Sequence, residues 1–463
     1  MNQLFDALIV GAGQAGPSLA GQLTAAGWKV GLVERKDFGG TCVNTGCTPT
    51  KALIASAKAA YTMREAARYG LSAASDFTVD LAQVQARKDA IVAASRGGLE
   101  KWLTTMAGCT IFRGTARFTS PTTMQVGAKV LEARHVFLNV GARPFGPPLP
   151  GLDQVPYLTS STILALKELP AHLLIVGAGA VGLEFAQLFR RLGSQVTLVE
   201  RSSRLLPHDD EDVAAAVADI LVGEGITLRL GAECISVGQE DGQPVVHVSC
   251  EADPTSSCGS HLLLAMGRQP NTDDLQLEKA GLQADARGYL AVDEALQTAV
   301  PGIWALGECN GRGAFTHTAY NDFEIVAANL LDHGQRRVSD RLPVSAIYLD
   351  PPFAKVGQTE AELRAAGIPA LVGKRPMTKV SRAVEKGETK GFIKVLVHAE
   401  TDQILGASII GTGGDEAIHC IITAMYARQT AAFMRRNMFI HPTVSELIPT
   451  VFGELKPLSA DTK

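Results

Sequence analysis

Two cysteines separated by four residues carry the clearest chemical signal in the sequence. Cys42 and Cys47 lie in the stretch GGTCVNTGCTPTK, which ends at Lys51. A close pair of thiols can form a structural disulfide, bind a metal ion, or open and close as a redox couple. A zinc site needs four ligands, and no second cysteine pair follows nearby. Because stable disulfides are rare inside cells, we favour a redox couple here and reduced thiols at the other cysteines, including Cys250 and Cys258 around a polar turn.

The composition is that of an ordinary globular protein. The chain has 463 residues, of which 46% are hydrophobic and 19% charged, and its formal net charge is −4. This length can hold two or three domains, and the charge offers no basic surface for nucleic acid. The start, MNQLFDALIVGAG, lacks the features of a secretory signal, and every apolar run is interrupted before about 18 residues. We therefore expect a cytoplasmic protein with no membrane span, no nucleic-acid partner and no bound metal.

Two stretches of the sequence resemble each other. DALIVGAGQAGPSLAGQLTAAGWKVGLVER lies near the start, and HLLIVGAGAVGLEFAQLFRRLGSQVTLVER begins at His172. Each predicts a buried strand, a glycine-rich turn, a helix, and a second strand that ends at a glutamate. The glycines and glutamates of the two copies are Gly11, Gly13, Gly16 and Glu34 in the first, and Gly177, Gly179, Gly182 and Glu200 in the second.

The spacing G-x-G-x-x-G is typical of a dinucleotide-binding unit. The first glycine permits the tight turn, the second lets the backbone approach a pyrophosphate, and the third lets the helix pack on the strand. The helix N-terminus favours the phosphate charge, and the glutamate accepts hydrogen bonds from a ribose. In each copy the glutamate follows the first glycine by 23 residues. The sequence therefore predicts two nucleotide cofactors held by α/β folds.

Four further motifs follow in order along the chain. VGARP contains Gly141, and AMGRQPNT contains Gly267. ALGECNG contains Gly307 and Glu308, and MFIHPTVSELIPT, near the C-terminus, begins three residues before His441. Each is weak evidence alone, because glycine turns and His-Pro pairs are common in loops. Their order together with the cysteine stretch and the two glycine repeats is far more specific.

With these motifs in this order, the chain resembles the pyridine nucleotide–disulfide oxidoreductases over nearly its whole length. That family includes dihydrolipoamide dehydrogenase, glutathione reductase, mercuric reductase and bacterial reductases of the reactive-chlorine-resistance type. The resemblance implies an α/β protein with two Rossmann-like domains: an FAD domain split by an inserted NAD(P) domain, followed by a C-terminal α+β dimerisation domain. The implied bounds are 1–150 and 271–338 for the two parts of the FAD domain, 151–270 for the NAD(P) domain and 339–463 for the dimerisation domain.

The resemblance also assigns roles to the cysteines and to one pair of charged residues. Cys42 would exchange with substrate. Cys47 would face the flavin at the start of a helix, whose positive end lowers the pKa of a thiol. Lys51 and Glu184 would form an ion pair beside the flavin and stabilise charge there.

Two residues near the C-terminus would act across a dimer interface. In the family this histidine, His441, is oriented by the glutamate at Glu446; it deprotonates the attacking thiol and protonates the leaving thiol. An ordinary imidazole titrates near neutral pH and can do both. In a homodimer the pair would complete the active site of the other subunit. The remaining cofactor contacts that the resemblance implies are those of Gly40, Thr41, Lys51, Gly141, Gly267, Gly307 and Glu308.

Several positions depart from particular members of the family. Ala180 stands where glutathione reductase has a gating tyrosine, and Phe439 stands where dihydrolipoamide dehydrogenase has a second histidine. His441 stands where mercuric reductase has a tyrosine, and no cysteine follows Cys420, which argues against genuine mercury reduction. Glu308 replaces the usual aspartate at the flavin ribityl chain, and its additional methylene shifts the carboxylate.

We therefore predict an FAD-dependent NAD(P)H oxidoreductase. Electrons would pass from nicotinamide through flavin to the Cys42–Cys47 disulfide and on to a small disulfide, or would run in reverse from a dithiol. The alternative acceptor is a metal ion, mercuric or cupric, or an oxidant. A flavoprotein that only binds partners is disfavoured, because the whole set of redox residues is retained. Glu200 favours NADH, and Arg201 and Arg204 allow some use of NADPH.

Overall fold

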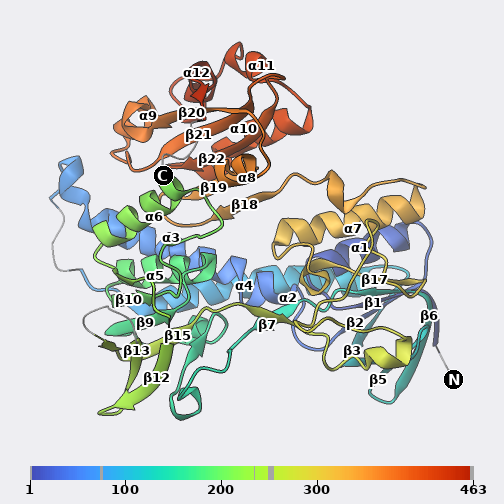
Figure 1. Cartoon of the computed structure of the whole chain (residues 1–463). Coiled ribbons are helices and arrows are strands. Elements are labelled where there is room, and N and C mark those ends of the chain that lie inside the picture. Colours follow the sequence, from blue (N-terminus) through green and yellow to red (C-terminus); the bar gives the residue numbers. More distant parts are fainter. Residues whose placement is uncertain (1–2, 73–76, 234, 249–254, 459–463) are drawn as a thin grey trace.

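The computed structural model describes residues 3–72, 77–233, 235–248 and 255–458. Two long helices, α3 (Cys47–Arg64) and α4 (Leu81–Thr105), run through the middle of the molecule. Three sheet-containing parts surround them, and the C-terminal part forms the top of the view in Figure 1. Within the described residues, no helix combines the length and the apolar character that a membrane crossing requires.

The first sheet combines N-terminal strands with one strand from much later in the chain. Its strands are β1 (Gln3–Val10), β2 (Val30–Glu34), β3 (Cys109–Arg113), β4 (Ala116–Ser120), β5 (Thr123–Val126), β6 (Lys129–Leu138) and β17 (Ile303–Ala305). Their order is β3-β2-β1-β6-β5-β4, and β17 pairs with β6 in parallel. The LIV run of β1 is buried because parallel neighbours and helices cover it on all sides. Since β17 returns after a second sheet, the predicted split of the first nucleotide fold is confirmed.

The second sheet repeats the strand–helix–strand unit of the first. Its strands are β8 (Leu158–Thr159), β9 (His172–Val176), β10 (Gln195–Val199), β11 (Thr227–Arg229) and β15 (His261–Leu264). All run parallel in the order β11-β10-β9-β15-β8. A small antiparallel sheet lies beside it, made of β12 (Ile235–Glu240), β13 (Gln243–Val248) and β14 (Ser256–Cys258). The chain enters and leaves this part through an antiparallel pair, β7 (Ala142–Pro144) with β16 (Arg268–Pro270).

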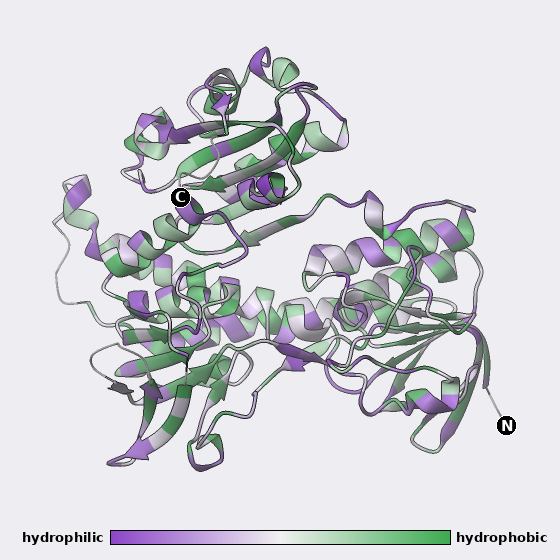
Figure 2. Cartoon of the chain, viewed as in Figure 1, coloured by the Kyte–Doolittle hydropathy of each residue, from purple (hydrophilic) through white to green (hydrophobic). Residues whose placement is uncertain are grey.

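The C-terminal part is built on a six-stranded antiparallel sheet. Its strands are β18 (Val344–Ile347), β19 (Phe353–Gly357), β20 (Ala370–Pro376), β21 (Phe392–His398), β22 (Ile404–Ile410) and β23 (Lys456–Pro457). The order is β18-β19-β22-β21-β20-β23. Figure 2 shows that the central strands of this sheet are largely hydrophobic, whereas the outer helices mix polar and apolar residues. The predicted α+β organisation of this part is confirmed.

Helices connect and cover the sheets. The others are α1 (Ala15–Ala25), α2 (Gly40–Asn44), α5 (Ala180–Leu192), α6 (Glu211–Gly223), α7 (Thr316–Leu331), α8 (Glu360–Ala365), α9 (Ser381–Glu385), α10 (Gly414–Tyr426), α11 (Ala431–Arg435) and α12 (Ile448–Gly453). α1 packs beside α7 over the first sheet. α1 and α5 each begin directly after a glycine loop, so both N-termini point at the predicted nucleotide sites.

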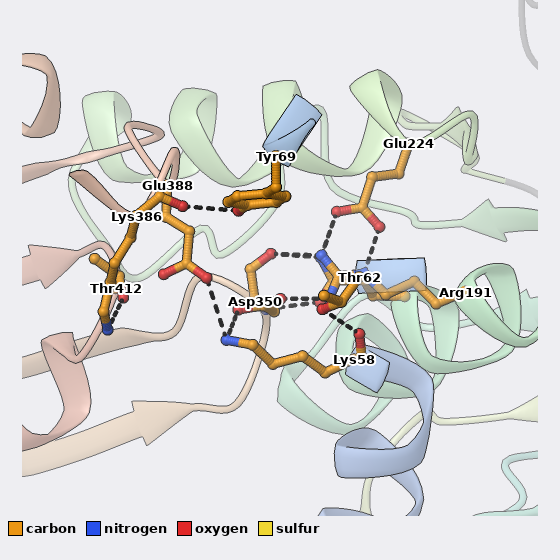
Figure 3. A network of polar contacts seen from close by, with 10 residues as sticks. Lys58, Thr62, Tyr69, Arg191, Glu224, Asp350, Lys386, Glu388 and Thr412 are labelled. Atoms are coloured by element: carbon orange, nitrogen blue, oxygen red, sulfur yellow. Dashed lines mark hydrogen bonds and ion pairs between the residues drawn. The ribbon is translucent and has the colours of Figure 1, made fainter. Parts of the chain in front are cut away.

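Asp350 of the C-terminal part links the other two parts of the protein (Figure 3). Its carboxylate pairs with Lys58 of α3 at 2.9 Å and also with Arg191 of α5. Arg191 is buried and pairs with Glu224 at 2.8 Å. A buried guanidinium that lost either carboxylate would be strongly destabilised. This network therefore fixes the three parts relative to one another.

A second buried network joins the C-terminal sheet to α6. The side chain of Lys394, on β21, is 1% exposed. Its Nζ lies 2.6 Å from Asp210, 2.7 Å from Asp212 and 2.8 Å from Glu360. Burial alone would lower the pKa of Lys394, but the hydrogen bonds from its ammonium to the three carboxylates raise it. The ammonium thus occupies the point where the three carboxylates converge.

Candidate active site

The redox segment begins where a turn at Gly39 and Gly40 leads into α2 and α3. Both glycines adopt the left-handed backbone, with φ of 92° and 59°. A Cβ at Gly40 would lie 2.9 Å from the Cα of Gly13, so the turn can pack against the first glycine loop only without a side chain. Cys42 lies in α2, and Cys47 is the first residue of α3. The fold therefore places the cysteine pair beside the first nucleotide site.

The two thiols of this pair differ in acidity. Both are free thiols, as are the other four described cysteines, whereas Cys234 and Cys250 lie outside the described residues. A hydrogen bond to the Cys42 thiol is the main cause that lowers the pKa of Cys47 to about 5; burial opposes this, and Thr316 and the charge of Lys51 support it. The Thr316 hydroxyl oxygen lies 3.4 Å from the Cys47 sulfur. The same hydrogen bond raises the pKa of Cys42, so Cys47 is the more acidic thiol of the pair.

Lys51 and Glu184 form the ion pair that the sequence suggested. The Lys51 Nζ lies 2.6 Å from Glu184 Oε2. Lys51 lies one turn after Cys47 on α3, whereas Glu184 lies on α5 after the second glycine loop. Tyr348 completes the cluster from the C-terminal part: its backbone amide donates to Glu184 Oε1 at 2.9 Å, and its ring centroid lies 4.5 Å from Lys51 Nζ. All three parts of the protein therefore meet near Cys47.

The first glycine loop is folded tightly against neighbouring backbone. A Cβ at Gly11 would lie 2.2 Å from the carbonyl oxygen of Asn139, and one at Gly16 would lie 2.2 Å from that of Gly11. The Asn139 side chain donates to the Gly11 carbonyl at 3.1 Å. Glu34 is buried, and its carboxylate accepts from the Ala12 amide at 2.8 Å. A loop that only glycine can form, a helix N-terminus and a carboxylate at the end of β2 fit a dinucleotide such as FAD.

The second glycine loop repeats this geometry around an open cavity. A Cβ at Gly182 would lie 2.0 Å from the Gly177 carbonyl, whereas one at Gly179 would meet nothing within 4 Å. The Glu200 carboxylate accepts from the Ala178 amide at 2.8 Å. A cavity of about 280 Å³ lies against this loop, Glu200 and residues 206–209. These features fit a second dinucleotide that can enter and leave.

Arg268, the first residue of β16, contacts two of the predicted cofactor residues beside the antiparallel β7–β16 pair. Its Nε lies 2.6 Å from Glu308 Oε1, and its Nη2 lies 3.4 Å from the Thr41 hydroxyl. The Glu308 carboxylate thus faces a guanidinium, while the displacement expected from its additional methylene stays a prediction. The three predicted glycines of this region, which all have positive φ, are Gly141, Gly267 and Gly307.

His441 and Glu446 form a pair at the surface of the C-terminal part. His441 Nδ1 lies 2.8 Å from Glu446 Oε2. The His441 side chain is 73% exposed, and nearby Met438 and Ile440 are 97% and 80% exposed. Among the described residues, no hydrogen bond or ion pair connects this pair to Cys42 within the chain. The structure therefore brings the histidine and glutamate together but leaves them on an open apolar surface.

The structure adds four residues to the predicted site. Asn139 and Arg268 lie inside the motifs VFLNVGARP and GRQPN, so the sequence could have identified both as candidate site residues. Thr316 lies shortly after the ALGE motif, but only the meeting of α7 with α3 relates it to sulfur. Tyr348 has no sequence signal, because its role depends on three distant segments packing together.

Comparison with known proteins agrees with this geometry. The family model for pyridine nucleotide–disulphide oxidoreductases matches residues 5–322, and the model for their dimerisation domain matches residues 344–452. A probable pyridine nucleotide–disulfide oxidoreductase, RclA, of Escherichia coli (strain K12) is 34% identical over 98% of this chain and 99% of that protein. A dihydrolipoyl dehydrogenase of Chlamydia muridarum is 33% identical over 100% of this chain and 98% of that protein.

A solved structure gives the same result. It is described as the Cu(II) complex of HOCl-induced flavoprotein disulfide reductase RclA from Escherichia coli, and it matches with a TM-score of 0.89 and 33% identity over 98% of this chain and 99% of that one. The two family models together span the cysteine pair, both glycine loops and most of the C-terminal sheet. The cofactors are therefore FAD and NAD(P)H, at sites whose residues fit two dinucleotides. The chain belongs to the pyridine nucleotide–disulphide oxidoreductase family and is an FAD-dependent NAD(P)H oxidoreductase that acts on sulfur groups.

Proposed function

We propose that the acceptor is a small disulfide, or that the enzyme runs in reverse and oxidises a small dithiol. The observation that carries this proposal is the 2.8 Å hydrogen bond between His441 and Glu446. This hydrogen bond orients His441 as an acid/base. Dithiol–disulfide exchange requires such a group to take up and give back protons. In the forward direction, NAD(P)H, a proton and one disulfide give NAD(P)⁺ and two thiols.

The residues that would hold the cofactors follow the two loops. FAD, when bound, supplies the two-electron carrier between the coenzyme and the cysteines. Lys51 and Glu184 would provide charge beside the flavin ring. The residues that would hold FAD are Gly11, Gly13, Gly16, Glu34, Gly40, Thr41, Lys51, Gly141, Gly307 and Glu308. The residues that would hold the nicotinamide coenzyme are Gly177, Gly179, Gly182, Glu200 and Gly267.

The thiol chemistry follows from the acidity of the pair. His441 donates through Nδ1 to Glu446, which leaves Nε2 as the base that takes a proton from Cys42. The Cys42 sulfur attacks the substrate disulfide, and the first leaving thiolate takes the proton from His441. The Cys47 thiolate then attacks the Cys42 sulfur, which forms the Cys42–Cys47 disulfide and expels the second substrate sulfur as a thiolate that takes its proton from water.

The proposal requires a homodimer, because His441 lies on an open surface of its own chain. Met438 and Ile440, which precede it, are apolar side chains that are 97% and 80% exposed, as is typical of a surface that another protein chain covers. A second copy that covered this surface would bring His441 to the other copy's Cys42. We include in the proposal a cytoplasmic location and the domain bounds 1–150, 151–270, 271–338 and 339–463.

A metal ion or oxidant is the second candidate acceptor. It is favoured by the similarity to an RclA structure that is described as a Cu(II) complex and as HOCl-induced. A metal or oxidant accepts electrons from the cysteine pair without a leaving thiol, so it has less need of His441.

An acceptor screen with purified flavoprotein distinguishes the two candidates. Lipoamide, glutathione disulfide, Cu(II), Hg(II) and quinones would be compared by kcat/KM, with the wild type and with His441→Gln. A disulfide acceptor predicts turnover of lipoamide or glutathione disulfide that His441→Gln removes. Turnover of Cu(II) alone, unaffected by His441→Gln, would refute the leading proposal.

For the coenzyme, we propose a preference for NADH with some use of NADPH. Glu200 is already bonded to backbone amides at Ala178 and Ser202, so its charge is fixed where a 2′-phosphate would lie. Arg204 donates to the Pro207 carbonyl at 2.8 Å, which engages one of the two guanidiniums that could attract that phosphate. A larger kcat/KM for NADPH than for NADH would contradict this preference.

A further inference from the structure

Tyr348 contacts both members of the Lys51–Glu184 pair. Its amide donates to Glu184 Oε1 at 2.9 Å, while Lys51 occupies Glu184 Oε2 at 2.6 Å. Its ring centroid lies 4.5 Å from the Lys51 ammonium. The tyrosine thus uses its backbone for the carboxylate and its side chain for the ammonium.

Tyr348 is itself held in place from both sides. The preceding residue, Ile347, ends β18 and pairs with Phe353 of β19. The second residue after it, Asp350, is anchored by Lys58 and Arg191. A short segment fixed at both ends can hold a neighbouring side chain to a narrow range of positions.

The pair needs this support because Lys51 lies partly in water. Its side chain is 33% exposed, and a lysine ammonium on a four-carbon stem has many competing rotamers. The face of an aromatic ring attracts a cation, and a backbone amide that donates to a carboxylate makes a charge-assisted hydrogen bond. Together these contacts favour the one arrangement in which Lys51 faces both Glu184 and the redox segment.

We propose that Tyr348 is a positioning residue for the Lys51–Glu184 pair, through which the C-terminal part controls the charge next to Cys47. The inference rests on the proposed role of that pair at the flavin and the thiolate.

The environment of the thiolate defines the expected effect. The titratable and polar groups that act on Cys47 or on Tyr348 are Cys42, Lys51, Glu184, Thr316, His317, Asp415 and Glu416. Lys51 is the cation that lowers the pKa of Cys47, whereas Glu184 raises it. A less well placed Lys51 would lower the pKa of Cys47 by less, so loss of the tyrosine ring should raise that pKa.

The test follows the thiolate spectroscopically in the two-electron-reduced flavoprotein. The long-wavelength absorbance of a thiolate beside flavin would be titrated with pH in Tyr348→Leu, which loses the ring but keeps the amide, and in Tyr348→Phe, which keeps both. We expect the midpoint to rise by about half a pH unit in Tyr348→Leu, as loss of a partly exposed cation–π contact allows, and to stay unchanged in Tyr348→Phe. Tyr348→Gln provides a second variant without the ring, and thermal unfolding establishes that each variant is folded.

A double-mutant cycle with Lys51→Met decides whether the tyrosine acts through the lysine. Lys51→Met alone should raise the midpoint, and adding Tyr348→Leu to it should have no further effect. An equal shift from Tyr348→Leu in both backgrounds, or no shift in the wild-type background, would overturn the inference. No shift from Lys51→Met itself would instead overturn the proposed role of the ion pair.

Discussion

The two glycine loops share a backbone plan but differ in what surrounds them. In both, the third glycine packs against the carbonyl of the first, and a glutamate accepts from an amide inside the loop. In the first loop, Gly13 is covered by Gly40 of the redox segment and by the Asn139 side chain. In the second, Gly179 faces open space beside a cavity of about 280 Å³.

One position explains much of this difference. Asn139 and Ala265 are equivalent, because each donates its amide at 2.8 Å to the carbonyl of the last residue of the central strand. Asn139 also bonds the Gly11 carbonyl with its side chain, whereas Ala265 has only a methyl group there. The same fold thus makes one closed loop, suited to a cofactor that stays, and one open loop, suited to a coenzyme that exchanges.

Blocking electron transfer at the cysteine pair, after both nucleotide sites, should have the largest effect. In Cys42→Ser, disulfide turnover should be lost, because the attacking sulfur is gone. NADH-driven reduction of a dye that accepts electrons without the cysteines should remain, because neither loop has changed. Steady-state rates with both acceptors measure this, and loss of dye reduction would mean that the sulfur pair also shapes a nucleotide site.

Crowding the closed loop should come next. In Gly16→Ala the new methyl group would lie 2.2 Å from the Gly11 carbonyl and 3.0 Å from the Asn139 amide, so the free energy of unfolding should fall by about 3 kcal/mol and bound flavin should be lost. Gly179→Ala, at the second glycine of the open loop, is the control for adding a methyl group, because that methyl group meets open space. Flavin absorbance per chain and chemical denaturation report both effects; equal flavin loss in the control would refute the contrast.

Removing the Asn139 side-chain amide should weaken the first loop less than Gly16→Ala does. Asn139→Ala leaves the Gly11 carbonyl without its side-chain donor, which should cost about 1.5 kcal/mol of stability and weaken flavin binding. Ala265→Ser, at the equivalent position of the second loop, should leave flavin binding unchanged. Flavin dissociation constants for both variants test this, and an unaltered constant in Asn139→Ala would show that the loop closes without the amide.

The smallest expected effect lies in the open loop. Glu200→Gln removes the charge that opposes a 2′-phosphate, so the ratio of kcat/KM for NADPH to that for NADH should rise about tenfold. Flavin content should not change, because Glu34 serves the other loop. A constant coenzyme ratio would mean that residues other than Glu200, such as Arg201 or Arg204, set the discrimination.

Local patterns predicted much of this arrangement. The strand, glycine turn and helix at Gly11 and at Gly177 could be predicted because their spacing and hydrophobic runs lie within about 30 residues of sequence. The Lys51–Glu184 pair came only from resemblance, since 133 residues separate its members.

Contacts between distant segments could not be predicted in the same way. The contact of Glu308 with Arg268 and the position of Tyr348 depend on how distant segments pack together. The hydrophobic periodicity of the sequence carries no information on that packing. The surface position of His441 depends on where the C-terminal sheet docks, and that docking is set by Asp350 and Lys394.

The contacts of Lys394 also determine whether a truncated fragment of the protein should be stable. A fragment that ended before the C-terminal sheet would retain Asp210 and Asp212 at the start of α6 but lose the ammonium that neutralises them. The buried Asp210 and the partly buried Asp212 would then repel each other without a neutralising ammonium, which should destabilise the start of α6. Truncation at this point should therefore give not an autonomous nucleotide-binding module but an incomplete protein, and the C-terminal sheet acts as a folding partner as well as a contact surface.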